Sequence, residues 1–356
     1  MTVYLSRDAA AKALGAEAVA AALAAAGAEP VRVGSRGMVW LEPLVEIELG
    51  GVRHAFGPVV PEDVPGILAD PAGHPKALGP TEQIPFFAAQ QRLTFARCGR
   101  IDPLSLAEYE AHGGLSGLRR ALAMDAEAIV EEVKASGLRG RGGAGFPTGI
   151  KWDTVRKADG ARKYIVCNAD EGDSGTFADR MLMEGDPFSL IEGMVIAGLA
   201  TGAELGYVYL RSEYPDAIEV MGEAIRLARE AGVLGASVLG SGRAFDMAVR
   251  VGAGAYVCGE ETSLLNSLEG KRGVVRPKPP LPAIEGFLGR PTVVNNVLSL
   301  ATVPVILEKG AEHYAGFGLG RSRGTIPVQI AGNVKRGGLF ETAFGMPLGR
   351  LVEEIG

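Results

Sequence analysis

The chain has 356 residues, a length that points to two or three domains rather than one small module. Its hydrophobic fraction of 47% and charged fraction of 22% are those of a globular protein and exclude a disordered chain. The net charge of -6 argues against nucleic-acid binding, which needs a surplus of Lys and Arg. Three distant cysteines and four scattered histidines argue against disulfides, a metal site in this chain and a His-based catalytic group. We therefore expect a cytoplasmic protein.

Residues 1–80 are predicted to form strand, helix, strand and hairpin, an order that is thioredoxin-like. The hairpin turn is Gly50-Gly51, and the helix is the alanine-rich run at residues 19–27. Acidic and basic residues are mixed before this run, which argues against a signal peptide. No apolar run is long enough for a membrane span, so we expect no membrane insertion. The Pro- and Gly-rich residues 71–85 are predicted to be a linker.

From Phe86 onward, helical and strand patterns alternate, which predicts an α/β fold with a largely parallel sheet. A helix is predicted at residues 125–136. Strands are predicted at residues 164–167, 207–210 and 247–251, and helices are predicted to open at Pro187 and Pro215. A strand at residues 325–331 and a turn at Gly337-Gly338 predict the opening of a third, β-rich domain.

The densest motif is the glycine-rich segment at residues 136–152, SGLRGRGGAGFPTGIKW. It contains GxGxxG but follows a helix rather than a strand, so it is no Rossmann fingerprint, and it lacks the Gly-Lys-Ser/Thr of a P-loop. Its free backbone N–H groups can hold the phosphate of a nucleotide or flavin, and Phe146 and Trp152 offer stacking surfaces. The alternative is a flexible loop without a ligand. The segment's cations are Arg139, Arg141 and Lys151.

Acidic residues follow the predicted strand at residues 164–167, in NADEGDSGTFAD. Ligands of open α/β sheets bind at the carboxyl ends of strands, so these carboxylates could accept hydrogen bonds from hydroxyl or carboxamide groups. They could equally be turn and helix-capping residues. Glu260 and Glu261 begin a helix after a second glycine-rich turn, where acids also complement the helix dipole.

Two further segments carry polar groups that could reach a ligand. Lys278 lies in the stiff segment RPKPPLP, which is either a linker or a strap that brings the lysine to a phosphate. Asn295 and Asn296 are paired amides before an apolar run, and each can both donate and accept hydrogen bonds.

In this order, the segments closely resemble the NADH-oxidising flavoprotein subunit of respiratory complex I and its relatives, the diaphorase subunits of NAD-linked formate dehydrogenases and NAD-reducing hydrogenases. The likeness runs from about Pro85 to the chain end. It implies a Rossmann-like FMN- and NADH-binding core at residues 81–322 and the start of a β-grasp (SLBB-type) domain at residues 323–356, after the thioredoxin-like domain at residues 1–80.

The resemblance also implies the cofactors FMN and NAD(H) and the residues that hold them. Its glycine loop holds both cofactors, through Gly140, Arg141, Gly142, Gly143, Ala144, Gly145 and Lys151. Positions that match flavin ligands are Asn168, Asp170, Glu171, Gly259, Glu260, Glu261, Asn295 and Asn296. Positions that face the dinucleotide are Phe146, Asp173 and Lys278. No side chain takes a catalytic role, because hydride passes between the two cofactors.

Residues 1–80 resemble the thioredoxin-like 2Fe-2S ferredoxins that accompany this subunit. The positions of the cluster cysteines hold Ser6, Ala11, Ser35 and Val39, so we expect no cluster there. The cysteines that ligate a 4Fe-4S cluster in full-length family members are also absent up to Gly356, so we expect a chain truncated before the iron-sulfur domain or one without this electron exit.

A cluster-free thioredoxin-like domain fused to this core resembles the beta subunit of formate dehydrogenase. The expected partners are therefore a thioredoxin-like 2Fe-2S subunit and a larger iron-sulfur subunit of the formate dehydrogenase alpha type. The alternatives are a complex I or NAD-reducing hydrogenase subunit and, in another class, a non-catalytic assembly subunit. A flavin-free dehydrogenase would need a strand before the glycine loop, and a sodium-pumping Rnf-type subunit does not fit the N-terminal unit.

Overall fold

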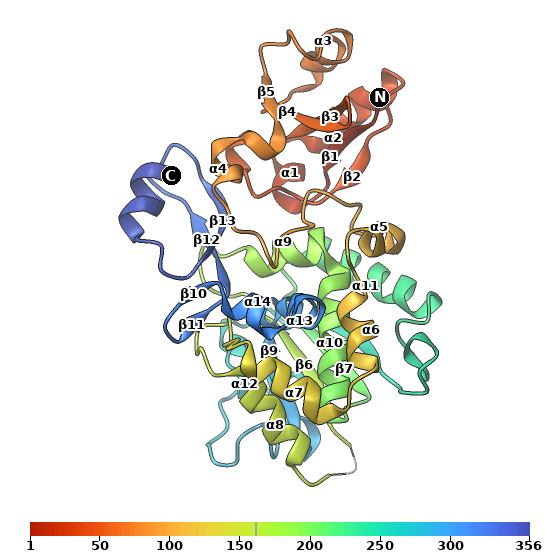
Figure 1. Cartoon of the computed structure of the whole chain (residues 1–356), viewed down its shortest axis with the longest axis vertical. Helices are drawn as coiled ribbons and strands as arrows, with labels where there is room; N and C mark the ends of the chain where they lie inside the picture. The colour runs from red at the N-terminus through yellow and green to blue at the C-terminus, as the bar shows by residue number, and fades with distance from the viewer. Residues whose placement is uncertain (161) are drawn as a thin grey trace.

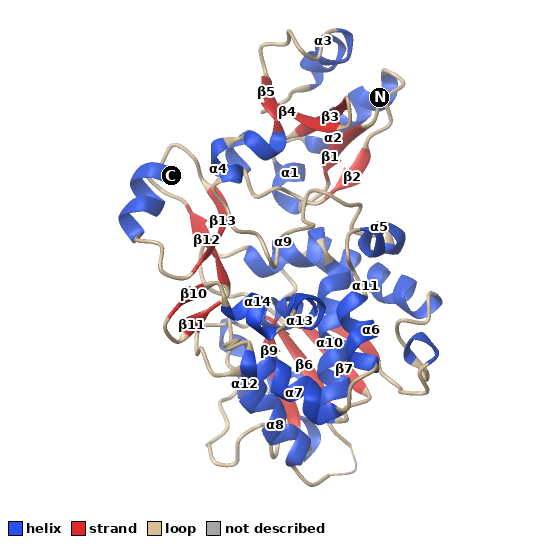
Figure 2. Cartoon of the chain, in the orientation of Figure 1, coloured by secondary structure: helices blue, strands red, loops and turns tan. Residues whose placement is uncertain are grey.

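The computed structural model of the chain describes residues 1–160 and 162–356. It has an α/β fold with a small sheet near the N-terminus, a parallel sheet in the middle and a hairpin near the C-terminus (Figure 1). Figure 2 shows the parallel sheet between layers of helices, with the N-terminal sheet apart from it at one end.

The N-terminal sheet has the strand order β2-β1-β3-β4-β5. Its strands are β1 (Val3–Ser6), β2 (Val31–Val33), β3 (Val45–Leu49), β4 (Val52–Phe56) and β5 (Ala77–Pro80). β1 is parallel to β2 and antiparallel to β3, as the predicted thioredoxin-like order requires. Gly50 and Gly51 both have positive φ, which a two-residue turn between β3 and β4 demands, so the predicted hairpin is confirmed.

The helices of the first hundred residues are short, apart from the alanine-rich one. They are α1 (Ala9–Ala13), α2 (Ala16–Ala25), α3 (Val64–Ala69) and α4 (Pro85–Ala88). The prediction that residues 71–85 form a linker is wrong at β5, which pairs antiparallel with β4. Gly79 and Pro80 are tolerated because this strand lies at the sheet edge, where one side of its backbone needs no partner.

The middle sheet has the order β8-β7-β6-β9, and every neighbouring pair is parallel. Its strands are β6 (Tyr164–Ala169), β7 (Leu205–Leu210), β8 (Asp246–Val251) and β9 (Thr292–Asn296). Ile165 and Cys167 face one hydrophobic cluster, whereas Tyr164 and Val166 face another, so both faces of the sheet are covered. The predicted α/β class and the three predicted strands are confirmed.

The helices that follow α4 pack on the two faces of the sheet or on one another. They are α5 (Leu106–Ala111), α6 (Ser116–Leu122), α7 (Ala126–Ala135), α8 (Thr148–Lys157), α9 (Ala178–Gly185), α10 (Pro187–Thr201), α11 (Pro215–Glu230), α12 (Glu261–Leu268), α13 (Val297–Lys309) and α14 (Ala311–Ala315). α10 and α13 are buried along almost their whole length. Asp125 caps α7 by accepting a hydrogen bond from the Ala128 N–H at 2.7 Å, and proline opens α10 and α11 as predicted.

The C-terminal segment forms two hairpins and a helical turn. They are β10 (Gly318–Leu319) with β11 (Ser322–Arg323), β12 (Thr325–Ile330) with β13 (Gly338–Ala343), and the turn Arg350–Ile355. Figure 1 shows β12 and β13 beside α4. Met38 and Phe86 share a hydrophobic cluster with Phe340 and Leu351, so the two ends of the chain pack together. The domain divisions at residues 80 and 322 and the β-grasp assignment stay predictions.

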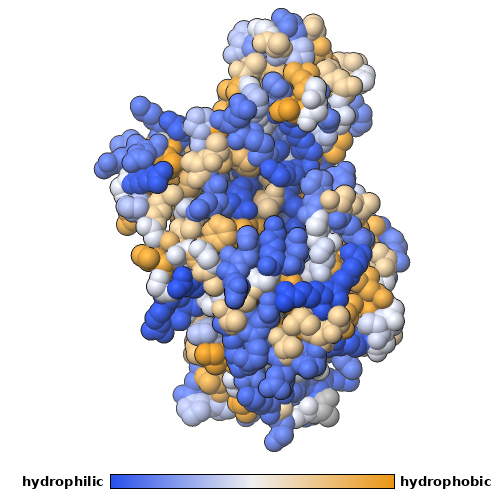
Figure 3. Space-filling model, viewed as in Figure 1, coloured by the Kyte–Doolittle hydropathy of each residue, from blue (hydrophilic) through white to orange (hydrophobic). Residues whose placement is uncertain are grey.

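Among the residues that the structure describes, no helix is long and apolar enough to cross a bilayer. On the face seen in Figure 3, hydrophilic residues predominate and hydrophobic residues are scattered among them.

Candidate functional site

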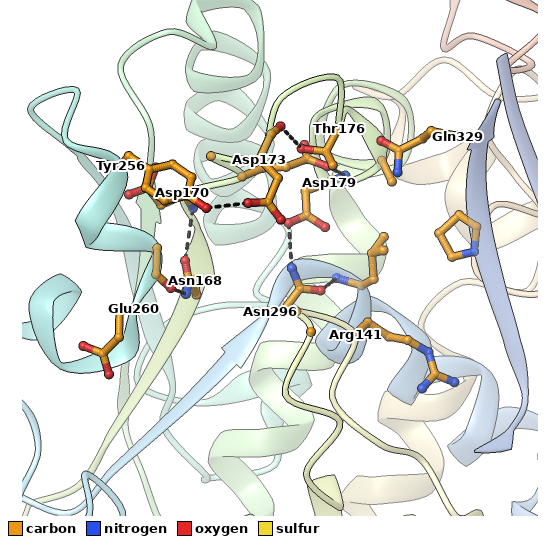
Figure 4. Close-up of a pocket in the computed structure, with 18 of the residues that line it drawn as sticks. Arg141, Asn168, Asp170, Asp173, Thr176, Asp179, Tyr256, Glu260, Asn296 and Gln329 are labelled. Atoms are coloured by element: carbon orange, nitrogen blue, oxygen red, sulfur yellow. Dashed lines mark hydrogen bonds between the residues drawn. The ribbon is translucent and has the colours of Figure 1, made fainter. Parts of the chain in front are cut away.

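A cavity of about 660 Å³ opens at the carboxyl ends of β6 and β9 and is also lined by residues of the segment 256–260. The sheet order places β7 on one side of β6 and β9 on the other, so the cavity lies at the point where the strand order reverses. Figure 4 shows Asn168, from β6, and Asn296, from β9, at its base, with Asp170 and Asp179 above them. The sequence motifs therefore meet at the edge of the sheet where α/β proteins bind ligands.

The glycine loop connects α7 to α8 and is closed at its stem. The Gly140 N–H donates to the Phe146 carbonyl at 2.9 Å, and the Thr148 N–H donates to the Leu138 carbonyl at 3.0 Å. A Cβ on Gly142 would lie 3.1 Å from Cβ of Asn296, so this glycine lets the loop approach the end of β9. The loop thus brings bare backbone to the wall of the cavity.

Arg141 fixes the loop rather than filling the cavity. Its N–H donates to Ser299 Oγ at 2.8 Å, and its guanidinium donates to the hydroxyl of Tyr314 and to the carbonyls of Arg139 and Arg323. The guanidinium points away from the acidic residues (Figure 4). Arg141 therefore ties the loop to α13 and to the C-terminal hairpins.

The stacking surfaces expected from Phe146 and Trp152 are not in this cavity. Trp152 is fully buried in the core and donates from Nε1 to Asn295 Oδ1 at 2.9 Å, so its role is structural. Phe146 is half-exposed but is not part of the cavity wall. A sequence cannot distinguish an aromatic side chain of the core from one that faces a ligand when both flank the same loop.

The acidic loop after β6 divides into two functions. Asp170 lines the cavity, and its Oδ2 atom is buried without a hydrogen-bond partner among the described residues. Burial raises the pKa of Asp170 to about 6, although the nearby Arg211 opposes this shift. Glu171 instead accepts hydrogen bonds from the N–H groups of Asp179 and Arg180, each at 3.1 Å, and so caps α9.

Asp179 lines the cavity; it is the last acid of the NADEGDSGTFAD motif, but it was not among the predicted ligand positions. It lies in the first turn of α9, is buried, and accepts a hydrogen bond from Asn296 Nδ2 at 2.6 Å. Burial, reinforced by the charge of Glu171, raises its pKa. The sequence of this segment also fits an amphipathic helix, and an acidic residue in such a helix is usually expected to face solvent.

Glu260 combines a cap with an ion pair. Its Oε2 atom accepts hydrogen bonds from the N–H groups of Thr262 and Ser263, and Lys278 Nζ lies 3.0 Å from its Oε1 atom. Partial burial opposes ionisation, but these hydrogen bonds and the ammonium outweigh it and lower the pKa of Glu260 to about 2. Lys278 also contacts Glu261 at 2.9 Å, as does Lys151 at 3.5 Å. The predicted strap lysine is thus anchored beside the cavity.

The structure gathers many of the predicted residues around one cavity. Those that line it are Arg141, Gly142, Gly143, Asn168, Asp170, Glu171, Asp173, Gly259, Glu260 and Asn296. Those outside its wall are Gly140, Ala144, Gly145, Phe146, Lys151, Glu261, Lys278 and Asn295. Asn295 is buried beside Trp152, which explains its position.

Several wall residues were not among the predicted site residues. Tyr256 donates its hydroxyl to Asp173 Oδ1 at 2.7 Å across the cavity mouth, with its ring near Gly172. Ile326, Pro327 and Gln329 of β12 form the opposite wall. Tyr256 had a local signal, since it lies within the glycine-rich segment before Glu260, whereas β12 approaches only through long-range packing.

The cavity contains carboxylates, amides and bare backbone, a set suited to hydroxyl, phosphate and amide groups of a bound cofactor. Nothing in the described ranges, 1–160 and 162–356, groups three or more His, Cys, Asp or Glu side chains for a metal ion. The nearby thiol of Cys167 is buried, and burial raises its pKa, so it is a poor nucleophile.

Comparison with known proteins agrees with this geometry. Residues 133–305 match the family model described as the Nuo51 FMN-binding domain. The chain is 49% identical over 267 residues to the NADP-reducing hydrogenase subunit HndC of Solidesulfovibrio fructosivorans, covering 75% of this chain and 54% of that protein. It is 53% identical over 250 residues to an NADH-quinone oxidoreductase subunit of Rhizobium meliloti (strain 1021), covering 70% of this chain and 59% of the relative.

A solved structure extends the likeness over the whole chain. An NAD+-reducing [NiFe]-hydrogenase, in the air-oxidised state, matches with a TM-score of 0.62 and 30% identity, over 99% of this chain and 60% of that chain. The chain thus spans less than two thirds of the length of each of these proteins. Residues 133–305, which carry the glycine loop, the acidic loop, Glu260 and both asparagines of the site, thus match the Nuo51 FMN-binding domain.

Proposed function

We propose that this chain is a diaphorase subunit that binds FMN and NAD(H) in the 660 Å³ cavity and moves electrons between them. The observation that carries the proposal is the convergence of the glycine loop, the acidic loop and Asn296 at the switch point of the parallel sheet. The match of residues 133–305 to an FMN-binding domain supports the choice of flavin.

The residues present fit such a cofactor. The buried, unpartnered Oδ2 atom of Asp170 can accept a hydrogen bond from a flavin hydroxyl, which would supply the missing partner. The bare N–H groups of Gly142 and Gly143 can hold a phosphate. Asn168 and Asn296 offer amide groups at the base of the cavity. Asp173 and Tyr256, at the mouth, are placed to contact a dinucleotide.

The chain supplies positioning and electrostatics rather than an acid, base or nucleophile. Bound FMN would supply the hydride exchange with NAD(H) and the release of two electrons one at a time. The carboxylates of Asp170, Glu171 and Glu260 line the same cavity, and their negative charge disfavours a gain of electrons there.

The proposal extends to the complex in which the chain works. We favour an NAD-dependent formate dehydrogenase, with a 2Fe-2S thioredoxin-like subunit and a larger iron-sulfur subunit as partners, because Ser6, Ala11, Ser35 and Val39 replace the cysteines of a cluster. The named relatives are hydrogenase and NADH-quinone oxidoreductase subunits, so these complexes are the alternatives.

The first test is a visible spectrum of the purified chain, with flavin released for identification and NADH added without oxygen. We expect bound or readily reconstituted FMN that bleaches on NADH addition, and weaker FMN binding in Asp170→Ala. Glu219→Ala, an exposed acid on α11, is the matched control and should bind FMN normally. A chain that takes up neither FMN nor NADH would contradict the proposal and favour an assembly role.

The complex is identified by a second experiment. Affinity-tagged chain from its native cells should bring down iron-sulfur partners, and the complex should reduce NAD+ with formate. Reduction with hydrogen instead, or NADH oxidation with a quinone, would identify a hydrogenase or a complex I and overturn the formate assignment.

A further inference from the structure

A second cavity, of about 700 Å³, shares no wall residue with the first. It lies between the stem of the glycine loop, the first turn of α8 and the segment around β10 and β11. Arg139, Pro147 and Gly149 form one side, and Arg321 and Arg323 form the other. The proposed flavin function assigns no role to this cavity.

The charges around this cavity are strongly unbalanced. Its wall carries Lys134 and three arginines but a single acid, Glu312, although the whole chain has a net charge of -6. Lys134 is neutralised by Glu131 at 2.7 Å and Asp153 at 2.8 Å. Within the described part of the chain, by contrast, no carboxylate lies within 4.0 Å of the guanidinium groups of the three arginines. Those arginines are Arg139, Arg321 and Arg323.

Neighbouring residues hold the backbone of Arg139 and Arg323 and the stem of Arg323. The Arg323 stem packs on Gly137, where a Cβ would lie 3.0 Å from Arg323 Cγ. The guanidinium of Arg141 donates to the carbonyls of Arg139 at 2.7 Å and Arg323 at 2.9 Å, which joins the two sides of the cavity. Among the described residues, the Arg323 guanidinium donates one hydrogen bond, to the Ala315 carbonyl at 3.2 Å.

We propose that this cavity binds a small molecule that bears phosphate groups. Guanidinium groups match phosphate oxygens with paired hydrogen bonds, and several unpaired ones around one cavity repel each other until an anion neutralises them. The size of the cavity is that of a small-molecule site, which favours such a ligand over an extended acidic peptide. The site is distinct from the flavin cavity, and its existence does not depend on the proposed function.

The test is calorimetric titration of the purified full chain, with and without FMN, using inorganic pyrophosphate as the probe. We expect saturable binding to one site in both forms. Arg321→Gln combined with Arg323→Gln should weaken it at least about tenfold, since each removes a charged hydrogen-bond donor. The Arg323 carbonyl that accepts from Arg141 is retained, so FMN content should not change. The single variant Arg321→Gln changes only an exposed side chain, so it still tests the site if the double variant does not fold.

Arg226→Gln is the matched control, because it removes the same charge from an arginine paired with Glu223 and Glu230 on α11. If this variant binds pyrophosphate as weakly as the double variant, the weakening comes from the loss of positive charge in general and not from the cavity, and the proposal is overturned. Absence of saturable binding, or loss of binding when FMN fills the first cavity, would overturn it as well. Tighter binding of a hexaglutamate peptide than of pyrophosphate would identify a macromolecular partner instead.

Discussion

At the scale of single residues, the neighbouring acids Asp170 and Glu171 differ in what they do for the protein. Asp170 has a buried oxygen without a partner, whereas Glu171 accepts hydrogen bonds from the first turn of α9 and from the Tyr214 hydroxyl at 3.1 Å. A side chain that binds a ligand can lack a hydrogen-bond partner when no ligand is present. A side chain that stabilises the fold already has its partners within the protein. The two acids should therefore respond differently to the loss of charge.

We expect Asp170→Asn to weaken FMN binding about tenfold or more while leaving thermal stability at neutral pH unchanged or raised. The reason is that burial raises the pKa of Asp170 to about 6, so its ionised form destabilises the fold above that pH. Glu171→Gln should instead lower the free energy of unfolding by about 1 kcal/mol, because one capping N–H loses its acceptor. Flavin fluorescence titration and urea unfolding measure the two effects. Equal destabilisation by both changes would contradict this division.

Glu42 makes stability depend on pH. It is fully buried, and burial together with the nearby Asp8 raises its pKa to about 8, although the Leu44 N–H and Ser35 hydroxyl oppose the shift. A raised carboxyl pKa favours the folded state at low pH, so this contribution is lost as pH rises from about 4.5 towards 8.

Urea unfolding across this pH window should show a falling free energy in the natural chain and a shallower fall in Glu42→Gln. The slope should not vanish, because burial also raises the pKa of Glu184 to about 7. Glu48→Gln, at an exposed position of the same sheet, serves as the control. Identical slopes in the natural chain and Glu42→Gln would contradict the assignment.

At the scale of elements, helix ends are joined to distant helices by buried carboxylates. Glu192 of α10 accepts hydrogen bonds from the N–H groups of Leu115 and Leu118, each at 2.8 Å, and so caps α6 from another helix. It also accepts from the Tyr109 hydroxyl. A carboxylate that is far away in the sequence thus fixes where α6 begins.

We expect Glu192→Ala to lower the free energy of unfolding by about 3 kcal/mol or more, because three buried donors lose their acceptor. Glu131→Ala, an exposed acid on α7, should change it by only about 0.5 kcal/mol. Chemical denaturation of the two variants provides the comparison. A loss for Glu192→Ala no larger than for Glu131→Ala would show that water replaces the carboxylate.

The elements that the sequence predicts well are those with local causes. Asp125 caps α7, Pro187 opens α10, and Gly50-Gly51 turns β3 into β4. β5 was missed because its strand conformation depends on pairing with β4 rather than on its own residues. The candidate site shows the same difference between local and long-range causes. Asp170 could be predicted because it lies in a local motif, the acidic loop after β6.

Other site residues depend on contacts between distant segments. Asp179 ends the same acidic motif, but it faces the cavity only because α9 packs beside Asn296. Gln329 reaches the cavity because β12 lies along its wall, where the Gln329 side chain accepts a hydrogen bond from the Phe177 N–H. Trp152 was misjudged for the same reason, since its burial depends on how α8 packs against β9. Sequence spacing carries no information about such approaches.

At the scale of the whole molecule, the C-terminal hairpin joins parts that are far apart in sequence. Glu341 of β13 is fully buried and accepts hydrogen bonds from the N–H groups of Thr94 and Phe95. The Leu339 N–H donates to the Gly37 carbonyl at 2.9 Å, while β12 forms a wall of the 660 Å³ cavity. The shape of the cavity is therefore coupled to the packing of the N-terminal sheet.

Residues of α1 and of the loop after β2 also contact α9 and α11. α9 is the helix that carries Asp179 to the cavity. The Ala9 N–H donates to Glu184 Oε2 at 2.7 Å, and Lys12 forms an ion pair with Asp216. Gly34 lies against Gly185 so closely that a Cβ would lie 2.6 Å from the Gly185 Cα. A methyl group at this position must move one backbone away from the other.

We therefore expect Gly34→Ala to lower the melting temperature, to speed hydrogen exchange in α9 and, through Asp179, to weaken FMN binding. Gly222→Ala is the control, because a Cβ there meets open space on α11, and alanine should stabilise that helix by about 0.5 to 1 kcal/mol. Hydrogen exchange followed by mass spectrometry locates the response. If exchange quickens only within residues 1–56 and α9 is unchanged, the N-terminal unit does not position the 660 Å³ cavity and the two are not coupled.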